Sequence, residues 1–231
     1  MKKLLLAAIV SLAAVLPASS ATLYSQFVFD DGTDTLGNST GSGAGTIAGG
    51  TYNHAINEGW SVALGTTLNT WSIVMNFESD ETSGFRRLMD FSGLSSENGL
   101  YIDDAQIRFV PSTQSTATVV ANTFHTVALT FDGTDSNVYF DGSFLYTINT
   151  SGAGHPAPIS SFVVVQDEGF SGVEASAGSL DYLEVYSGAL TSGEIAALSG
   201  PAAVPLPAGV VLLLSGLGAL GIARRRRGAA A

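Results

Sequence analysis

Short runs in which apolar and polar residues alternate recur through the middle of the chain. In the clearest run, Phe124–Phe131, apolar side chains occupy every second position, which places them on one face of an extended strand. Apolar runs resume at Val138–Phe140 and Phe144–Ile148, after the turn dipeptides Asp132-Gly133 and Asp141-Gly142. Because Asp-Gly favours tight hairpin turns, this part of the chain is predicted to be a three-stranded β-meander.

Similar runs occur elsewhere, and no long helical pattern accompanies them. The further predicted strands are Leu23–Phe29, Trp71–Phe77, Leu100–Val110, Ser161–Val165 and Leu180–Tyr186. Short strands separated by turns predict an all-β sandwich or barrel. Gly32–Gly50 consists mostly of Gly, Ser, Thr and Asn, and we predict a long loop there. A capping-box pattern at Thr191–Glu194 predicts one short helix, which Ile195–Leu198 completes.

The N-terminus has the pattern of a signal peptide. Two lysines precede the largely apolar run Leu4–Leu16, and small residues follow at Ser19 and Ala21. Signal peptidase is therefore expected to cleave after residue 21, so that Thr22 begins the mature protein. The apolar run is too short to span a bilayer comfortably.

The C-terminus changes composition after Gly200. Residues 201–209 contain three prolines and form a helix-averse linker, residues 210–223 carry no charge, and residues 224–231 begin with four arginines. The uncharged segment would span about 21 Å as a helix, which is short of a ~30 Å hydrocarbon core. Extending it back to Leu206 brings the length to about 27 Å. We predict a transmembrane helix whose arginines stay in the cytoplasm, with the domain formed by residues 22–200 outside.

The charge of residues 22–200 is strongly negative. This segment holds all 20 acidic residues but only three arginines and no lysine, so its formal charge is 3 − 20 = −17, against −11 for the whole chain. Such a surface repels nucleic acid and suits divalent cations. The chain has no cysteine, which excludes disulfides, thiol catalysis and thiolate metal sites.

Three stretches of the domain resemble laminin-G-like, concanavalin A-like domains. Ala121–Asn149 is similar to the central hairpins of that family, with Phe124 and Phe140 where tryptophan and valine are usual. Leu180–Leu198 looks like the family's last strand and capping helix, and Trp71–Phe77 fits its early core strand. The resemblance implies a jelly-roll sandwich of two antiparallel sheets.

The tail carries a second resemblance, to the VPLPA variant of PEP-CTERM sorting signals of Gram-negative bacteria. The proline motif is followed by the apolar segment and then by the basic cluster; the residues concerned are Val204, Pro205, Leu206, Pro207, Ala208, Gly209, and then Arg224, Arg225, Arg226 and Arg227. The resemblance implies processing by an exosortase-type membrane protease, often alongside exopolysaccharide production. A simple tail anchor without sorting is the alternative.

Catalytic patterns are weak in this sequence. The resemblance implies that a retaining glycosidase of this fold would carry a Glu-x-Asp-x-x-Glu pattern on one strand, and this pattern is absent. The nearest pair, Asp181 and Glu184, would point to opposite faces of a strand unless a bulge intervenes. No Gly-x-Ser-x-Gly elbow occurs. His54, His125 and His155 are too scattered to suggest zinc, and His125 is expected to have a structural role. We therefore predict no enzymatic activity.

Two kinds of binding site remain candidates. Asp30, Asp31, Asp34 and Asn38 match a loop in which related domains often carry an Asp…Gly-Asn element, and their oxygens suit Ca²⁺. Solvated turn residues are the alternative for these side chains. Sugars stack on exposed aromatic rings; the candidate rings are Tyr24, Tyr52, Trp60, Tyr101, Tyr146 and Phe170.

The sequence thus predicts an exported protein that passes through an inner-membrane intermediate to the cell envelope, outer surface or extracellular matrix. Its domain is expected to bind exopolysaccharide or another surface component without catalysis, and not to bind nucleic acid. A structural matrix protein with no specific ligand and a glycoside hydrolase of the same fold are the alternatives.

Overall fold

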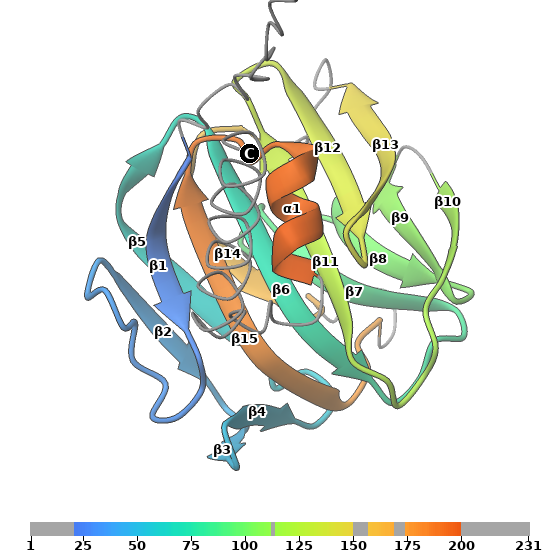
Figure 1. The fold of residues 1–231 in the computed structure, drawn as a ribbon. Coiled ribbons are helices and arrows are strands. Elements are labelled where there is room, and N and C mark those ends of the chain that lie inside the picture. Colours follow the sequence, from blue (N-terminus) through green and yellow to red (C-terminus); the bar gives the residue numbers. More distant parts are fainter. Residues whose placement is uncertain (1–20, 112–113, 150–156, 169–173, 200–231) are drawn as a thin grey trace, which may run out of the picture. The chain divides into compact units, whose positions relative to one another are not determined.

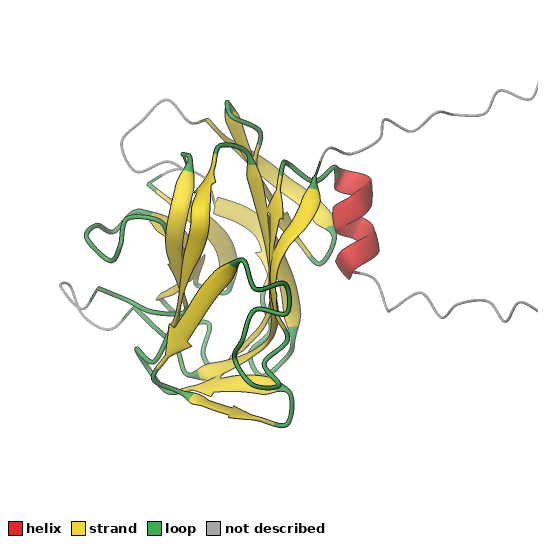
Figure 2. Ribbon diagram, turned by 90° about the vertical axis from the view of Figure 1, so that its left-hand side faces the viewer, coloured by secondary structure: helices red, strands yellow, loops and turns green. Residues whose placement is uncertain are grey.

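Two antiparallel β-sheets pack face to face, and one short helix lies on the outer face of one of them (Figures 1 and 2). The computed structural model describes residues 21–111, 114–149, 157–168 and 174–199. Residues 1–20 of the expected signal peptide, the sorting motif, the apolar tail segment and the basic cluster lie outside these ranges. For the part of the chain that the structure describes, the expected two-sheet sandwich is confirmed.

Sheet A runs in the order β13-β12-β11-β6-β15-β4-β3, and β1 also pairs with β15. Its strands are β1 (Thr22–Phe27), β3 (Thr46–Ala48), β4 (Thr51–His54), β6 (Trp71–Ser79), β11 (His125–Phe131), β12 (Asp135–Phe140), β13 (Ser143–Asn149) and β15 (Gly178–Ser187). The neighbours β11, β12 and β13 form the meander predicted from the two Asp-Gly turns.

Sheet B runs in the order β10-β9-β8-β7-β14-β5-β2. Its strands are β2 (Ser39–Gly43), β5 (Trp60–Leu68), β7 (Phe85–Asp90), β8 (Gly99–Asp103), β9 (Gln106–Val110), β10 (Gln114–Thr118) and β14 (Ile159–Val164). The predicted strand Leu100–Val110 is in fact the hairpin β8–β9, because Asp104 and Ala105 turn the chain with φ of 45° and 65°.

The core lies between the two sheets and is rich in aromatic side chains. Trp71 and Phe77 of β6 are fully buried. The indole N–H of Trp71 donates to the carbonyl of Ala157 at 2.9 Å, so the ring's one polar group keeps a partner inside the core.

Helix α1 (Ser192–Ser199) packs on the outer face of sheet A. Its buried Ile195 joins a small apolar cluster that includes Val74 and Ala128 from the facing strands. The predicted capping box is present: the Thr191 amide donates to Glu194 Oε2 at 2.8 Å, and the Glu194 amide donates to Thr191 Oγ1 at 3.4 Å.

The prediction of a long loop over Gly32–Gly50 was wrong, because this segment contains strands β2 and β3. The composition suggests a loop because glycine occupies the positions of β2 that face the core. A Cβ at Gly41 would collide with the rings of Trp60 and Phe27, and a Cβ at Gly43 would collide with Tyr52. Glycine lets the strand lie directly against these aromatic rings, and the hydrophobic alternation that normally marks a strand is lost.

Candidate functional site

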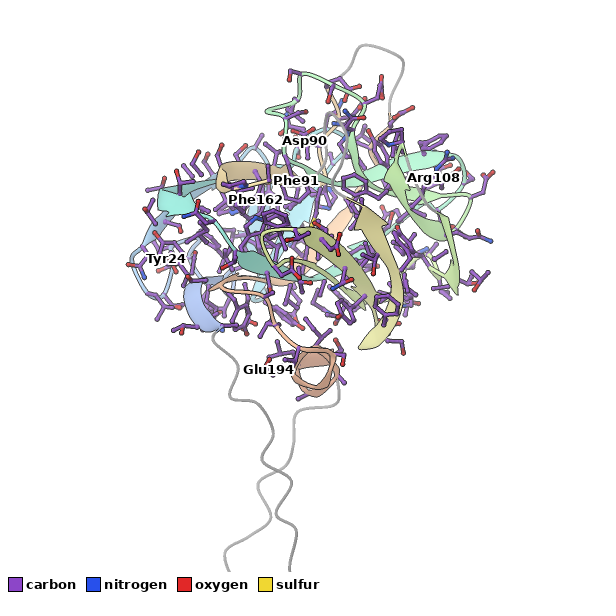
Figure 3. The ribbon with its side chains drawn as sticks, turned by 90° about the horizontal axis from the view of Figure 1, so that it is seen from above. Tyr24, Asp90, Phe91, Arg108, Phe162 and Glu194 are labelled. Atoms are coloured by element: carbon purple, nitrogen blue, oxygen red, sulfur yellow. The ribbon has the colours of Figure 1, made fainter. Side chains whose placement is uncertain are left out.

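The outer face of sheet B is the candidate site. Seen from above, Glu194 on α1 lies on one side of the sandwich and Asp90 on the opposite side (Figure 3). Strand register places Ser42, Ser61, Val163 and Asp90 in one row across β2, β5, β14 and β7. Because paired residues share a face of a sheet, these four side chains point outward together.

Three adjoining hollows form a shallow groove over β2, β5 and β14, which we call the hydroxyl groove. They have volumes of about 430, 280 and 190 Å³, and neighbouring hollows share lining residues. The outward side chains of the groove are Thr40, Ser42, Ser61, Ala63, Ser161 and Val163.

The hydroxyl groups of this groove are not used by the fold. Among the residues that the structure describes, Thr40, Ser42, Ser61 and Ser161 make no side-chain hydrogen bond to another protein group. Open, uncharged hydroxyls on a concave surface are suited to hydrogen bonding with a polar, uncharged ligand.

The other half of the face is charged and surrounds Arg87 of β7. The Arg87 side chain is fully buried; its Nη1 lies 2.8 Å from Asp90 Oδ2, and its Nη2 contacts the Glu168 carboxylate. Glu97 and Asp167 lie 3.7 and 3.9 Å from the same guanidinium. We call these five residues the Arg87 cluster. The ring of Tyr101 lies under the guanidinium, 4.9 Å from ring centroid to Cζ.

Asp90 connects the Arg87 cluster to the loop that follows β7. Its Oδ1 accepts hydrogen bonds from the amides of Ser92 and Leu94 at 3.0 and 2.8 Å, and its Oδ2 accepts one from the Ser92 hydroxyl. The Arg87 guanidinium also donates to the carbonyl of Ser96 at 3.1 Å. The loop is thus folded over the charged half of the face, and the cluster is built into the fold.

Carboxylates outnumber the single cation in the Arg87 cluster, which changes their acidity. Burial raises the pKa of Glu168 to about 7; the neighbouring carboxyl groups of Glu97 and Asp167 add to the rise, and Arg87 opposes it. Burial, followed by the charges of Glu97 and Asp167, also raises the pKa of Glu174. Glu168 is therefore partly protonated near neutral pH.

The hydroxyl groove and the Arg87 cluster are adjacent. Asn57 and Gln166 line one end of the groove. The Asp167 amide donates to Asn57 Oδ1 at 3.0 Å, and Asp167 directly follows Gln166 in the chain. At the middle of the groove, Val163 is the register partner of Asp90.

The predicted calcium residues do not converge around one point. Asp34 accepts four backbone N–H bonds: Oδ1 accepts from Gln26 and Leu36, and Oδ2 from Asn38 and Ser39, at 2.8 to 3.1 Å. The carboxylate thus organises its own loop.

The other members of the predicted calcium loop are occupied elsewhere or lie at the surface. Asp31 accepts from the amide and hydroxyl of Thr33, Asp30 is exposed, and Asn38 donates to the carbonyl of Tyr24. No group of three or more acidic or histidine side chains within the described ranges could hold a metal ion. The calcium site stays a sequence prediction.

The aromatic candidates for sugar stacking are mostly inside the fold. Tyr52, Trp60, Tyr101 and Tyr146 are buried, Tyr24 is half-buried, and Phe170 lies outside the described residues.

The histidines differ in role. His125 is structural, as predicted: its Nε2 accepts from the Val120 amide at 3.1 Å, and its Nδ1 lies 2.8 Å from Asp141 Oδ2. Burial lowers the pKa of His54, which favours the neutral ring. His155 lies outside the described residues.

Two further predictions concern the chain ends and membranes. Ala21, expected to precede the cleaved bond, packs at the edge of the apolar cluster under α1, while Ser19 lies outside the described ranges. The described part of the chain contains no helix with the length and hydropathy needed to cross a bilayer.

Sequence reasoning missed the groove and the Arg87 cluster. The available signal was that Arg87 is one of three basic residues in the domain and lies in a strand-like segment next to apolar residues. A cation in that position suggests a buried partner. In the sequence Asp167-Glu168 is only a pair of neighbouring acids, and neither its burial nor its partner can be read from it.

The sandwich, the covering helix and the open polar face define a jelly-roll domain of the lectin and glucanase type. A laminin-G-type model, described as the concanavalin A-like lectin/glucanases superfamily, matches residues 49–196. The chain belongs to this superfamily, as the resemblance of the three stretches implied.

Solved structures of similar fold include carbohydrate-active proteins. Trypanosoma rangeli sialidase in complex with 2,3-difluorosialic acid aligns with a TM-score of 0.60 and 20% identity, covering 77% of this chain and 32% of the sialidase. Domain 4 of AbnA, an extracellular arabinanase from Geobacillus stearothermophilus in complex with arabinotriose, aligns with a TM-score of 0.52 and 17% identity, covering 78% of this chain and 99% of that domain.

The CBM40 domain of a Ruminococcus gnavus sialidase, bound to α2,3-sialyllactose, aligns with a TM-score of 0.50 and 16% identity, covering 65% of this chain and 96% of that domain. Identities at this level show the shared fold alone. The chain spans only about a third of the length of the T. rangeli sialidase. A comparison with curated protein sequences found no match.

Proposed function

We propose that this domain binds extracellular polysaccharide in the hydroxyl groove, without catalysis. The observation that carries the proposal is the row of hydroxyl side chains on a shallow surface that is not covered by α1, none of them used by the described fold. A shallow groove made of adjoining hollows suits a chain of sugars, and polysaccharides offer hydroxyls that Ser and Thr can donate to and accept from. The superfamily membership and the sugar-bound structures of similar fold support this class of ligand.

The absence of catalysis is supported by the burial of three carboxyl groups of the Arg87 cluster. A glycosidase presents two carboxyl groups to the scissile bond from the two sides of a cleft. The side chains of Asp90 and Asp167 are fully buried, Glu168 is 1% exposed, and all three face Arg87. A raised pKa such as that of Glu168 also occurs in catalytic acids, and this makes hydrolysis the alternative to test.

Blocking the groove tests the binding proposal. Ala63 is exposed and lines two of the three hollows, so Ala63→Tyr places a large outward side chain in the groove without changing charge. We expect binding of exopolysaccharides, found on a polysaccharide array and measured by calorimetry, to weaken at least about tenfold while folding stability is kept.

The matched control is Thr67→Tyr, an exposed position of the same strand that lines none of the three hollows. Equal binding by Ala63→Tyr and the unaltered protein would rule out the groove as the site. Release of reducing ends from a polysaccharide, lost in Glu168→Gln, would establish hydrolysis instead.

We also propose that the protein is sorted to the cell surface through its C-terminal motif. The support is the order of proline motif, apolar segment and arginines in residues 204–227. Intact-mass measurement of the protein from its native host is expected to show a product lacking Arg224–Arg227. A mature product that keeps these arginines would support a simple tail anchor.

A further inference from the structure

The surroundings of the groove differ sharply from its floor in charge. The outward side chains of the floor are uncharged, whereas residues 22–200 have a formal charge of 3 − 20 = −17. All three basic residues of this segment are already paired within the fold: Arg86 with Glu81, Arg87 with Asp90, and Arg108 with Asp103, each at 2.8 Å. The charge of each arginine is therefore already balanced by a carboxylate before an anionic ligand arrives.

Negative charge is concentrated at the end of the groove lined by Asn57 and Gln166. Asn57 accepts the Asp167 amide, so the backbone that carries Asp167 and Glu168 borders this end directly. Glu97 of the Arg87 cluster keeps 47% of its side chain exposed, and Glu58 follows Asn57 in the chain. Arg87 supplies one positive charge to four carboxyl groups, and only Glu168 among them is partly protonated near neutral pH, so the field at this end of the groove is negative.

Resting on the proposed function, we infer that the hydroxyl groove selects polysaccharides by charge. It takes chains of neutral or amine-bearing sugars and excludes chains that carry carboxylate, sulfate or phosphate groups. A neutral chain needs only the hydrogen bonds of the floor, and an ammonium group near Glu97 is attracted. An acidic chain gains the same hydrogen bonds but is repelled along its whole length, and like-charge contacts are an effective way to reject a ligand.

One polymer in three charge forms provides the test. The whole chain is titrated with an amino-sugar polysaccharide that is fully N-acetylated, partly N-deacetylated, or carboxymethylated. We expect the deacetylated form to bind at least as tightly as the acetylated form, and the carboxymethylated form about tenfold or more weaker at low salt. The difference in affinity between the acetylated and carboxymethylated forms should narrow as salt is raised, because exposed charges are screened.

Two variants that each remove one negative charge locate the effect. Glu97→Gln neutralises the exposed carboxylate of the Arg87 cluster, while Asp181→Asn neutralises an exposed residue of β15 in the other sheet. Glu97→Gln is expected to improve binding of the carboxymethylated form about twofold relative to the acetylated form, and Asp181→Asn to change it less.

The outcomes separate the two claims. Equal binding of the carboxymethylated and acetylated forms overturns charge selection and leaves polysaccharide binding in place. If none of the three forms binds and no polysaccharide on the array binds either, the proposed function is overturned and the charge selection with it.

Discussion

Replacement of Arg87 with methionine is expected to lower the free energy of unfolding by about 3–5 kcal/mol. Methionine keeps much of the length of the side chain but removes its charge. The carboxylates of Asp90 and Glu168 would then be buried without the cation that contacts both of them. Leaving a buried charge uncompensated costs far more than the original pair contributed, which is why one substitution has so large an effect.

Arg108→Met is the matched control. Arg108 also pairs with an aspartate of the same sheet, Asp103 at 2.8 Å, but 31% of its side chain is exposed. Water can replace Arg108 as the partner of Asp103, so we expect the free energy of unfolding to fall by at most about 1 kcal/mol. Urea unfolding of both variants measures the difference. Similar losses would show that Arg87 is not the central charge of a buried cluster.

The loss in Arg87→Met should also depend on pH. With a pKa of about 7 against an ordinary 4.5, Glu168 keeps a proton in the folded protein that the unfolded chain releases. This group therefore makes the unaltered protein less stable as pH rises from about 4.5 to about 7. Without Arg87 the carboxyl groups hold their protons still more strongly. The free energies of unfolding of the variant and the unaltered protein are therefore expected to differ less at about pH 5 than at about pH 8. A loss that is equal at both pH values would contradict this account.

Asp34→Ala is expected to cost about 2–3 kcal/mol, because one carboxylate accepts four backbone N–H bonds and alanine can accept none. Partial burial alone would raise the pKa of Asp34, but these bonds outweigh it and lower the pKa below its ordinary value of 3.8. The contribution of Asp34 is thus present above pH 3.8 and is lost as pH falls through the lowered pKa. Thermal or urea unfolding at neutral pH measures the effect.

Asp31→Ala and added Ca²⁺ serve as the controls for Asp34. Within the described ranges Asp31 bonds only to Thr33, two residues away, so its replacement should leave stability nearly unchanged. Because the Asp34 oxygens are already occupied by amides, we expect no stabilisation of the unaltered protein by Ca²⁺ through this loop. A calcium-dependent rise in the melting temperature, abolished by Asp34→Ala, would establish the predicted calcium site instead.

Much of the fold could be predicted because its signals are local. Alternation over Phe124–Phe131 and the two Asp-Gly turns determine a hairpin series before any distant contact forms. Thr191 and Glu194 satisfy each other's backbone amides within one helical turn, so the capping box was equally readable. Strand β2 escaped prediction because glycine at positions 41 and 43 is required by rings from β1, β4 and β5, and the local sequence carries no trace of those rings.

The candidate site is non-local and was therefore not predicted. The groove combines residues from β2, β5 and β14, and β5 and β14 are neighbours in the sheet although they lie far apart in the chain. Serine and threonine at exposed strand positions are common, and only their alignment by register gives them a shared surface. Likewise Arg87 meets Glu168 only because β7 and β14 are neighbours in sheet B.

The sequence by itself determined the all-β class, the meander, the short capped helix, the acidic character of the domain and the lack of cysteine. Each of these depends on residues close together in the chain, or on composition alone. Only the tertiary structure decided which face of the sandwich is open, that small hydroxyl side chains line it, and that one buried arginine holds the carboxylates at its end. Pairing between distant strands brings these groups together, and that pairing is set by burial of the core and not by the exposed residues that form the site.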